Sequence, residues 1–152
     1  MSEPLIVKNT ISINAPAAKV WDALVNPDQT QKYMFGCRTV SDWQVGSPLT
    51  WEMEYEGKPF TPVKGNIVRI EPNKLLEYSV IDPTNPNIPD APENYLYVIY
   101  DLQEAGGVTT LTVSQGDYSK VADGEKRYQD TYNNGEGWNP ILIQIKALVE
   151  GE

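Results

Sequence analysis

The segment that most constrains the fold is Gly135–Glu150, which reads GEGWNPILIQIKALVE. Apolar side chains recur along it at the spacing of one helix face. They are Trp138, Ile141, Leu142, Ile145, Leu148 and Val149. Such a stripe has to be buried against another element, so the segment predicts a terminal helix that packs on a sheet. Ile143 lies off the stripe, and we expect it to touch short helices nearby or to stay partly exposed.

A proline marks the start of this helix. Pro140 is comfortable in a first turn behind a capping asparagine, whereas a proline inside a helix costs about 3 kcal/mol. The preceding Glu125–Asn133 is also helical in pattern, with Tyr128 and Tyr132 one turn apart. We therefore expect a terminal helix that is broken or kinked between Asn134 and Pro140. A break there would allow the preceding segment to move as a gate.

The middle of the chain alternates apolar and polar residues as strands do. Short turn signals such as Gly106-Gly107 separate the alternating runs, and turns this short join antiparallel strands. The longer connection Asp82–Pro92 holds four prolines and predicts a stiff loop, either a solvated spacer or a lid. The expected strands are Leu5–Ile13, Leu49–Tyr55, Thr61–Ile70, Leu75–Ile81, Tyr95–Leu102 and Val108–Gln115.

Two cap-and-proline signals follow the first strand. Asn14 predicts a helix over Ala17–Val25, and Asn26 with Pro27 predicts a second helix that ends near Tyr33. The order is therefore strand, two short helices, a run of strands and a terminal helix. Residues 1–152 show no repeat and no second core, so we expect one α+β domain.

The absence of histidine removes several kinds of chemistry. With no histidine and one cysteine, Cys37, the chain cannot build a Ser-His-acid or Cys-His site, nor the usual transition-metal site. We expect Cys37 to be a packed thiol and the protein to need no metal or cofactor. Acid–base chemistry by tyrosine or carboxylate groups stays open, although no motif marks it.

The charge of the chain argues against polyanionic partners. A formal net charge of −9 disfavours binding to nucleic acid or to anionic membranes. No apolar run approaches the ~20 residues of a membrane span, and the amino terminus lacks a signal-peptide pattern. We therefore expect a soluble, cytoplasmic protein.

Three groups of residues resemble one known family when taken in order. They are Ile11–Leu24 (ISINAPAAKVWDAL), Gly65–Pro72, and Gly137-Trp138 with the helix that follows. The chain is similar over nearly its whole length to homologues of the activator of the heat-shock protein 90 ATPase, within the START-like or SRPBCC superfamily. It departs from them at Tyr33-Met34, at Gln115, in the Asp82–Pro92 loop and at Pro140.

The resemblance implies a helix-grip fold like that of the birch-pollen allergen. In this α+β fold a curved antiparallel sheet of about six or seven strands, two short helices and a long carboxy-terminal helix enclose a cavity. Relatives bind lipids, polyketides or other apolar molecules, some are cyclases, and the eukaryotic activators bind the chaperone.

Three functions follow as alternatives. The first is binding of a small hydrophobic ligand, as carrier or sensor; the second is an enzyme of cyclase or hydrolase type; the third is a chaperone-interacting ATPase activator of the stress response. We expect the first, without catalytic residues. The side chains expected around the cavity are Trp51, Met53, Tyr78, Tyr100, Val113, Gln115, Trp138 and Leu142.

Overall fold

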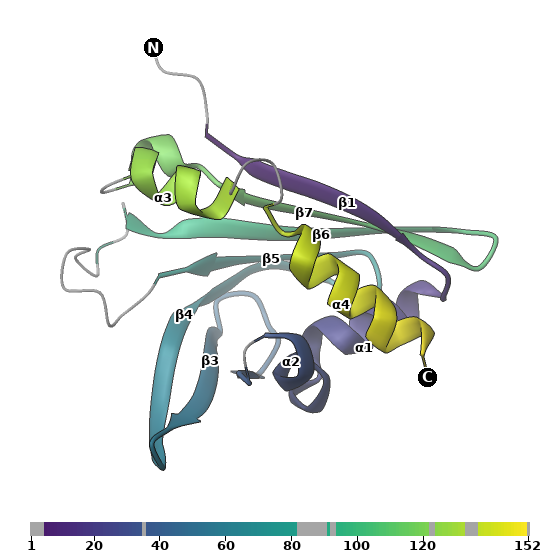
Figure 1. The fold of residues 1–152 in the computed structure, drawn as a ribbon, viewed down its shortest axis with the longest axis horizontal. Coiled ribbons are helices and arrows are strands. Elements are labelled where there is room, and N and C mark those ends of the chain that lie inside the picture. The colour runs from purple at the N-terminus through teal and green to yellow at the C-terminus, as the bar shows by residue number, and fades with distance from the viewer. Residues whose placement is uncertain are drawn as a thin grey trace.

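The computed structural model of the 152-residue chain describes residues 5–34, 36–81, 91, 94–121, 124–132 and 137–151. Its centre is a seven-stranded antiparallel sheet with the order β1-β7-β6-β5-β4-β3-β2. Figure 1 shows this sheet with helices packed against one side. The strands are β1 (Val7–Ile13), β2 (Arg38–Ser41), β3 (Pro48–Tyr55), β4 (Lys58–Glu71), β5 (Leu75–Val80), β6 (Leu96–Ala105) and β7 (Val108–Gly116).

The six strands expected from the alternation are all present, and the α+β helix-grip fold is confirmed. β2 is not among the expected strands, because its four residues allow a single buried position, Thr39, which is polar. β2 pairs with β3 and forms one edge of the sheet.

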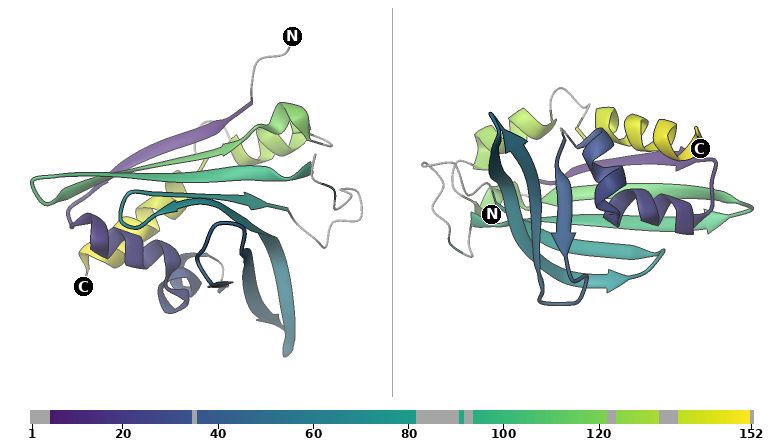
Figure 2. Two further views of the ribbon diagram at one scale, coloured as in Figure 1. Left: turned by 180° about the vertical axis from the view of Figure 1, so that it is seen from behind. Right: turned by 90° about the horizontal axis from the view of Figure 1, so that it is seen from below.

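The sheet is strongly curved. Figure 2 shows β3 and β4 bending away from the plane of β1, β7 and β6, with α1 (Ala17–Val25), α2 (Pro27–Tyr33) and α4 (Asn139–Glu150) on the inner side. Gly65 lies in β4 close to β5, where an added Cβ would stand 1.6 Å from the Ser79 carbonyl oxygen. Only glycine allows so close an approach of two strands.

The carboxy-terminal helices are two separate elements. α3 spans Gly124–Tyr132, and α4 spans Asn139–Glu150 with Pro140 in its first turn. The predicted break is thereby confirmed, although residues 133–136 lie outside the described part of the chain. The expected cap of α4 by Asn139 is wrong, because Trp138 occupies the N-cap and makes no side-chain cap hydrogen bond. Leu142, Ile145 and Val149 of α4 are buried against β1 and the short helices, while Ile143 is 60% exposed as expected.

The two short helices begin differently. Asn26 caps α2, because its side-chain oxygen accepts a hydrogen bond from the Asp28 N–H at 2.9 Å. The expected cap of α1 by Asn14 is wrong: Pro16 occupies the N-cap, and its side chain has no acceptor. The Glu104 carboxylate, at the end of β6, accepts the Ala17 N–H at 2.6 Å instead. A distant residue in the sequence therefore supplies the cap.

The proline-rich loop and the possibility of a membrane-spanning helix are the two remaining expectations about the fold. The loop Asp82–Pro92 lies outside the described residues apart from residue 91, so its lid role is untested. In the described part of the chain, no helix has both the length and the apolar character needed to cross a membrane.

Replacing Glu104 with alanine tests the cap across the fold. The variant removes the acceptor of an orphan helix N–H, and we expect the free energy of unfolding to fall by about 1 kcal/mol. Gln103→Ala, at an exposed neighbour on the same strand, is the control and should unfold like the wild type. Urea titrations followed by circular dichroism would measure both, and equal stability of the two variants would contradict the cap.

Candidate ligand-binding pocket

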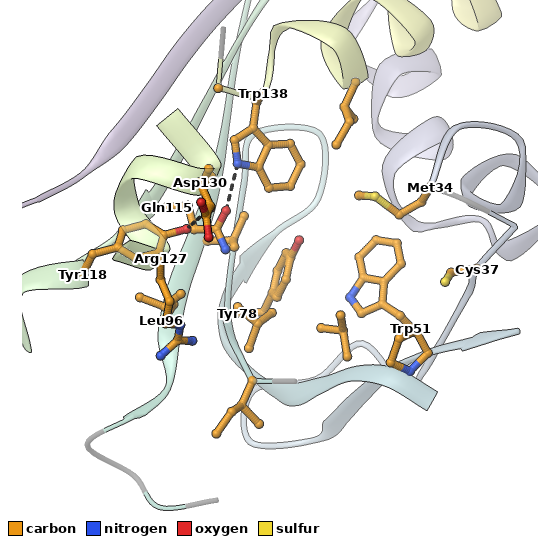
Figure 3. A pocket seen from close by; sticks show the side chains of 18 of the residues that line it. Met34, Cys37, Trp51, Tyr78, Leu96, Gln115, Tyr118, Arg127, Asp130 and Trp138 are labelled. Carbon is orange, nitrogen blue, oxygen red and sulfur yellow. Dashed lines mark hydrogen bonds between the residues drawn. The ribbon is translucent and has the colours of Figure 1, made fainter. Parts of the chain in front are cut away.

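A pocket of about 710 Å³ lies on the inner side of the curved sheet, between the strands, α3 and the start of α4. Figure 3 shows the labelled side chains pointing toward this space from opposite walls. Most of the lining is apolar. These side chains are Met34, Cys37, Trp51, Met53, Pro62, Val63, Val80, Ile81, Leu96, Val98, Trp138 and Ile141. Burial raises the pKa of the Cys37 thiol, which keeps it protonated and less reactive.

Trp138 is held by hydrogen bonds from both its backbone and its side chain. Its backbone N–H donates to Asn9 Oδ1 at 2.9 Å, and its indole Nε1–H donates to Gln115 Oε1 at 3.0 Å. The residue before it, Gly137, has φ +48°, and an added Cβ would lie 2.3 Å from Asn9 Oδ1. The Gly137-Trp138 pair is therefore fixed on β1, and the indole is fixed over β7.

A row of aromatic rings crosses the sheet from Trp51 to Trp138. Ring centroids are 6.3 Å apart for Trp51 and Tyr78, 5.7 Å for Tyr78 and Tyr100, and 6.0 Å for Tyr100 and Trp138. The Tyr100–Trp138 pair is edge-to-face, an arrangement that aromatic quadrupoles favour. The row links β3, β5 and β6 to the start of α4, so the pocket wall is built on the rigid sheet.

The phenols of this row are neutral at physiological pH. Tyr78 Oη and Tyr100 Oη are 3.0 Å apart and share a hydrogen bond. Burial raises the pKa of Tyr100 to about 12, against a smaller opposing effect of the Tyr78 hydrogen bond. Burial and then the Tyr100 charge raise the pKa of Tyr78 well above its ordinary value. Both side chains can donate or accept hydrogen bonds, and neither is an ionised base.

One end of the pocket is more polar than the rest. Tyr118 Oη donates to Thr131 Oγ1 at 3.0 Å, which joins the segment after β7 to α3. Burial raises the pKa of Tyr118, while the Thr131 hydrogen bond and the nearby Arg127 charge oppose this. Arg127 is half-buried and Asp130 is exposed, and both line this end. Among the described residues, no three cysteine, aspartate or glutamate side chains gather as a metal site would require.

Five of the eight expected site residues line the pocket: Trp51, Met53, Tyr78, Gln115 and Trp138. Tyr100, Val113 and Leu142 do not line the pocket and are fully buried in the core. Burial alone does not separate the two groups, since the lining residues Tyr78 and Val98 are buried as well. Alternation along a strand predicts which side chains face inward, but it cannot separate core from pocket.

The residues of the polar end are not among the expected site residues. Tyr118, Arg127, Asp130 and Thr131 come from the turn after β7 and from α3. The helical pattern of α3 was visible, with Tyr128 and Tyr132 one turn apart. The rings of Tyr128 and Tyr132 are stacked with their centroids 5.5 Å apart, and Tyr118 packs edge-on against Tyr128 with a centroid distance of 5.9 Å. This contact sets which face of α3 turns to the pocket.

Known proteins resemble this chain in fold and in sequence. The fold is similar to the solution structure of ChR145 from Cytophaga hutchinsonii, with TM-score 0.76 and 34% identity, covering 99% of this chain and 97% of that one. It is also similar to MLL2253 from Mesorhizobium loti, with TM-score 0.71, 18% identity and coverage of 96% and 97%. The Aha1 dimer from Colwellia psychrerythraea gives TM-score 0.67, 16% identity and coverage of 95% and 96%.

The more distant two of these likenesses concern the fold alone, and no curated protein sequence matches the chain. The family model described as "Activator of Hsp90 ATPase homolog 1-like protein" matches residues 14–150, nearly the whole chain. This match agrees with the resemblance of Ile11–Leu24, Gly65–Pro72 and Gly137-Trp138, and the chain belongs to the family of Activator of Hsp90 ATPase homolog 1-like proteins.

Proposed function

We propose that this protein binds a small hydrophobic ligand in the pocket between the sheet and the carboxy-terminal helices, as a carrier or sensor. The observation that carries the proposal is the pocket itself. Its volume of about 710 Å³ lies within the range of roughly 300–1,000 Å³ found for small-molecule sites. Its walls are mainly aliphatic and aromatic, with a few polar groups, which is the usual composition of such sites.

The polar groups favour binding over catalysis. The phenols of Tyr78 and Tyr118 have raised pKa values, so they hold their protons and act through hydrogen bonds. In the described part of the chain, Asp130 is the one carboxylate of the lining, and it is exposed. Apart from Arg127 and Asp130 at the polar end, the lining is neutral, and its hydroxyl and amide groups can orient a ligand through hydrogen bonds.

The family name supports a second candidate, stimulation of the ATPase of an Hsp90-type chaperone. The two candidates differ in what they require: a ligand site needs the pocket, whereas a chaperone contact needs exposed surface. We expect the purified chain to leave the ATPase rate of the host's Hsp90-type chaperone unchanged in a coupled assay. Stimulation together with co-purification would favour the second candidate over the first.

A larger side chain inside the pocket should block the ligand. Met53 lines the pocket and is half-buried, so Met53→Trp takes up pocket volume with little disturbance of the core. We expect freshly purified wild-type protein to retain a small molecule in native mass spectrometry. The variant should lose most of it, and its affinity for ligands found by thermal-shift screening of lipids and aromatics should fall about tenfold or more.

The matched control is Ile143→Trp, which adds the same side chain on the exposed face of α4. It should retain ligand as the wild type does. A wild-type protein with no retained molecule and no stabilising compound would contradict the proposal, as would unchanged binding by Met53→Trp.

The buried phenols predict loss of stability in alkaline solution. The pKa values of Tyr33, Tyr78 and Tyr100 are raised in the folded state, that of Tyr100 to about 12. Phenols in the unfolded chain ionise near 10, so the contribution of these groups to stability is complete below about pH 10 and is lost as pH rises above it, for Tyr100 through a pKa of about 12. Tyrosinate absorbance and circular dichroism recorded together should show these three groups ionising only as the fold is lost.

The control compares two tyrosine variants. Tyr78→Phe should reduce the steepness of the alkaline loss of stability, because one buried phenol is gone. Tyr97→Phe, at a tyrosine that is 43% exposed, should leave the steepness unchanged. Full ionisation of all nine tyrosines while the circular dichroism spectrum stays native would contradict the burial of these phenols.

A further inference from the structure

The orientation of the Gln115 amide is determined by its partner. An indole N–H can only donate, so the Gln115 atom 3.0 Å from Trp138 Nε1 has to be the oxygen. The NH2 of the Gln115 amide therefore points away from the Trp138 indole nitrogen. It makes no hydrogen bond within the part of the chain that the structure describes. Gln115 lines the pocket, and Figure 3 shows its amide beside the open space below Trp138.

The hydrogen bond between Tyr78 and Tyr100 can be considered in the same way, by counting donors and acceptors. Two hydroxyls joined by one hydrogen bond have one hydrogen left over. Tyr100 is fully buried behind the lining, and within the described residues its hydroxyl has no acceptor except Tyr78 Oη, at 3.0 Å. A Tyr100 hydroxyl hydrogen without an acceptor in this buried place would lower the stability of the fold. Either hydroxyl can donate in this pair. In the arrangement with Tyr100 as donor, the Tyr78 hydrogen is left for an acceptor in the pocket, which Tyr78 lines and Tyr100 does not.

These two groups can give the pocket hydrogen-bond donors. Gln115 accepts from the Trp138 indole and so offers its amide N–H to the pocket, and Tyr78 offers its O–H when it accepts from Tyr100. They are connected through the edge-to-face contact of Tyr100 with Trp138, so both donors belong to one rigid aromatic cluster. An occupant without an oxygen acceptor would leave both donors unpaired, at a cost in affinity.

Resting on the proposed function, we propose that the ligand is an apolar, ring-containing molecule with a neutral carbonyl oxygen that accepts hydrogen bonds from Gln115 Nε2 and Tyr78 Oη. A carbonyl oxygen has two lone pairs and can accept from both donors. A carboxylate fits less well, because these donors are uncharged and burying an anion is expensive. Arg127 and Asp130 stand together at the polar end, so their charges oppose each other there, whereas the net charge of −9 of the whole chain adds repulsion. The rings of Trp51 and Trp138 provide the apolar walls for the remainder of the molecule.

Three anthracenes substituted at the same ring carbon test the carbonyl. Acetylanthracene carries the ketone, isopropenylanthracene replaces the oxygen with a methylene group of similar shape, and anthracene carboxylate carries the anion. Fluorescence titration of the full chain gives a Kd for each. We expect the ketone to bind about 3- to 10-fold more tightly than the alkene for each hydrogen bond made, and the carboxylate to bind more weakly than the ketone.

Variants then assign the preference to the two donors. Gln115→Glu keeps an acceptor for the Trp138 indole but removes the donor, Gln115→Leu removes both, and Tyr78→Phe removes the second donor. Each should reduce the ketone-to-alkene ratio toward one, whereas Gln103→Leu, the same change at an exposed glutamine, should preserve it. Circular dichroism melting verifies that each variant is folded.

The outcomes separate this inference from the proposed function. Equal affinity of the wild type for ketone and alkene would overturn the inference and leave ligand binding intact. A ketone preference that survives in the Gln115 variants and in Tyr78→Phe would also overturn it. Tighter binding of the carboxylate than of the ketone would replace the neutral carbonyl with an anion. Binding of none of the three would count against the proposed function, and the inference would fall with it.

Discussion

The rest of the structure depends on the attachment of Trp138 to the sheet. Its backbone N–H is held by Asn9 of β1, and its indole N–H is held by Gln115 of β7. These bonds fix the point at which the chain enters α4, so the apolar stripe of that helix begins in the correct place over the sheet. Gly137 makes the close approach to Asn9 possible, because any side chain there would collide with the asparagine. One residue therefore sets both the helix position and one wall of the pocket.

Core and pocket share the same aromatic cluster. Tyr100 belongs wholly to the core, while its neighbours Tyr78 and Trp138 have one side in the core and the other on the pocket. A ligand that touches these rings therefore contacts groups already ordered by packing, and little conformational entropy is lost on binding.

Membership of the family of Activator of Hsp90 ATPase homolog 1-like proteins does not by itself distinguish a ligand site from a chaperone contact. The distinction has to come from the side chains of this chain. Its pocket combines apolar walls with neutral hydrogen-bonding groups, and its charged groups stand at the end formed by α3. This distribution supports the proposed binding of an uncharged molecule whose apolar body is buried.

Much of the fold could be predicted from the sequence because it depends on local pattern. The alternation in Leu49–Tyr55 indicated a strand, and Pro140 behind Asn139 indicated a new helix rather than a continued one. β2 was not predicted, because four residues with a polar buried position show almost no periodic pattern. The cap of α1 was not predicted either, because Glu104 lies close to Ala17 only in the tertiary fold.

The sequence by itself determined the order of elements, the inward faces of the strands and the presence of an apolar stripe on the last helix. These follow from side-chain period and from the backbone limits of proline and glycine, which act over a few residues. Only the tertiary structure decided that Tyr100, Val113 and Leu142 are core while Tyr78 and Gln115 face the pocket, and that α3 supplies its polar end. The physical reason is that the curvature of the sheet and the position of Trp138 set the distance between the facing walls of the pocket. That distance decides whether an inward side chain meets a neighbour or an open space.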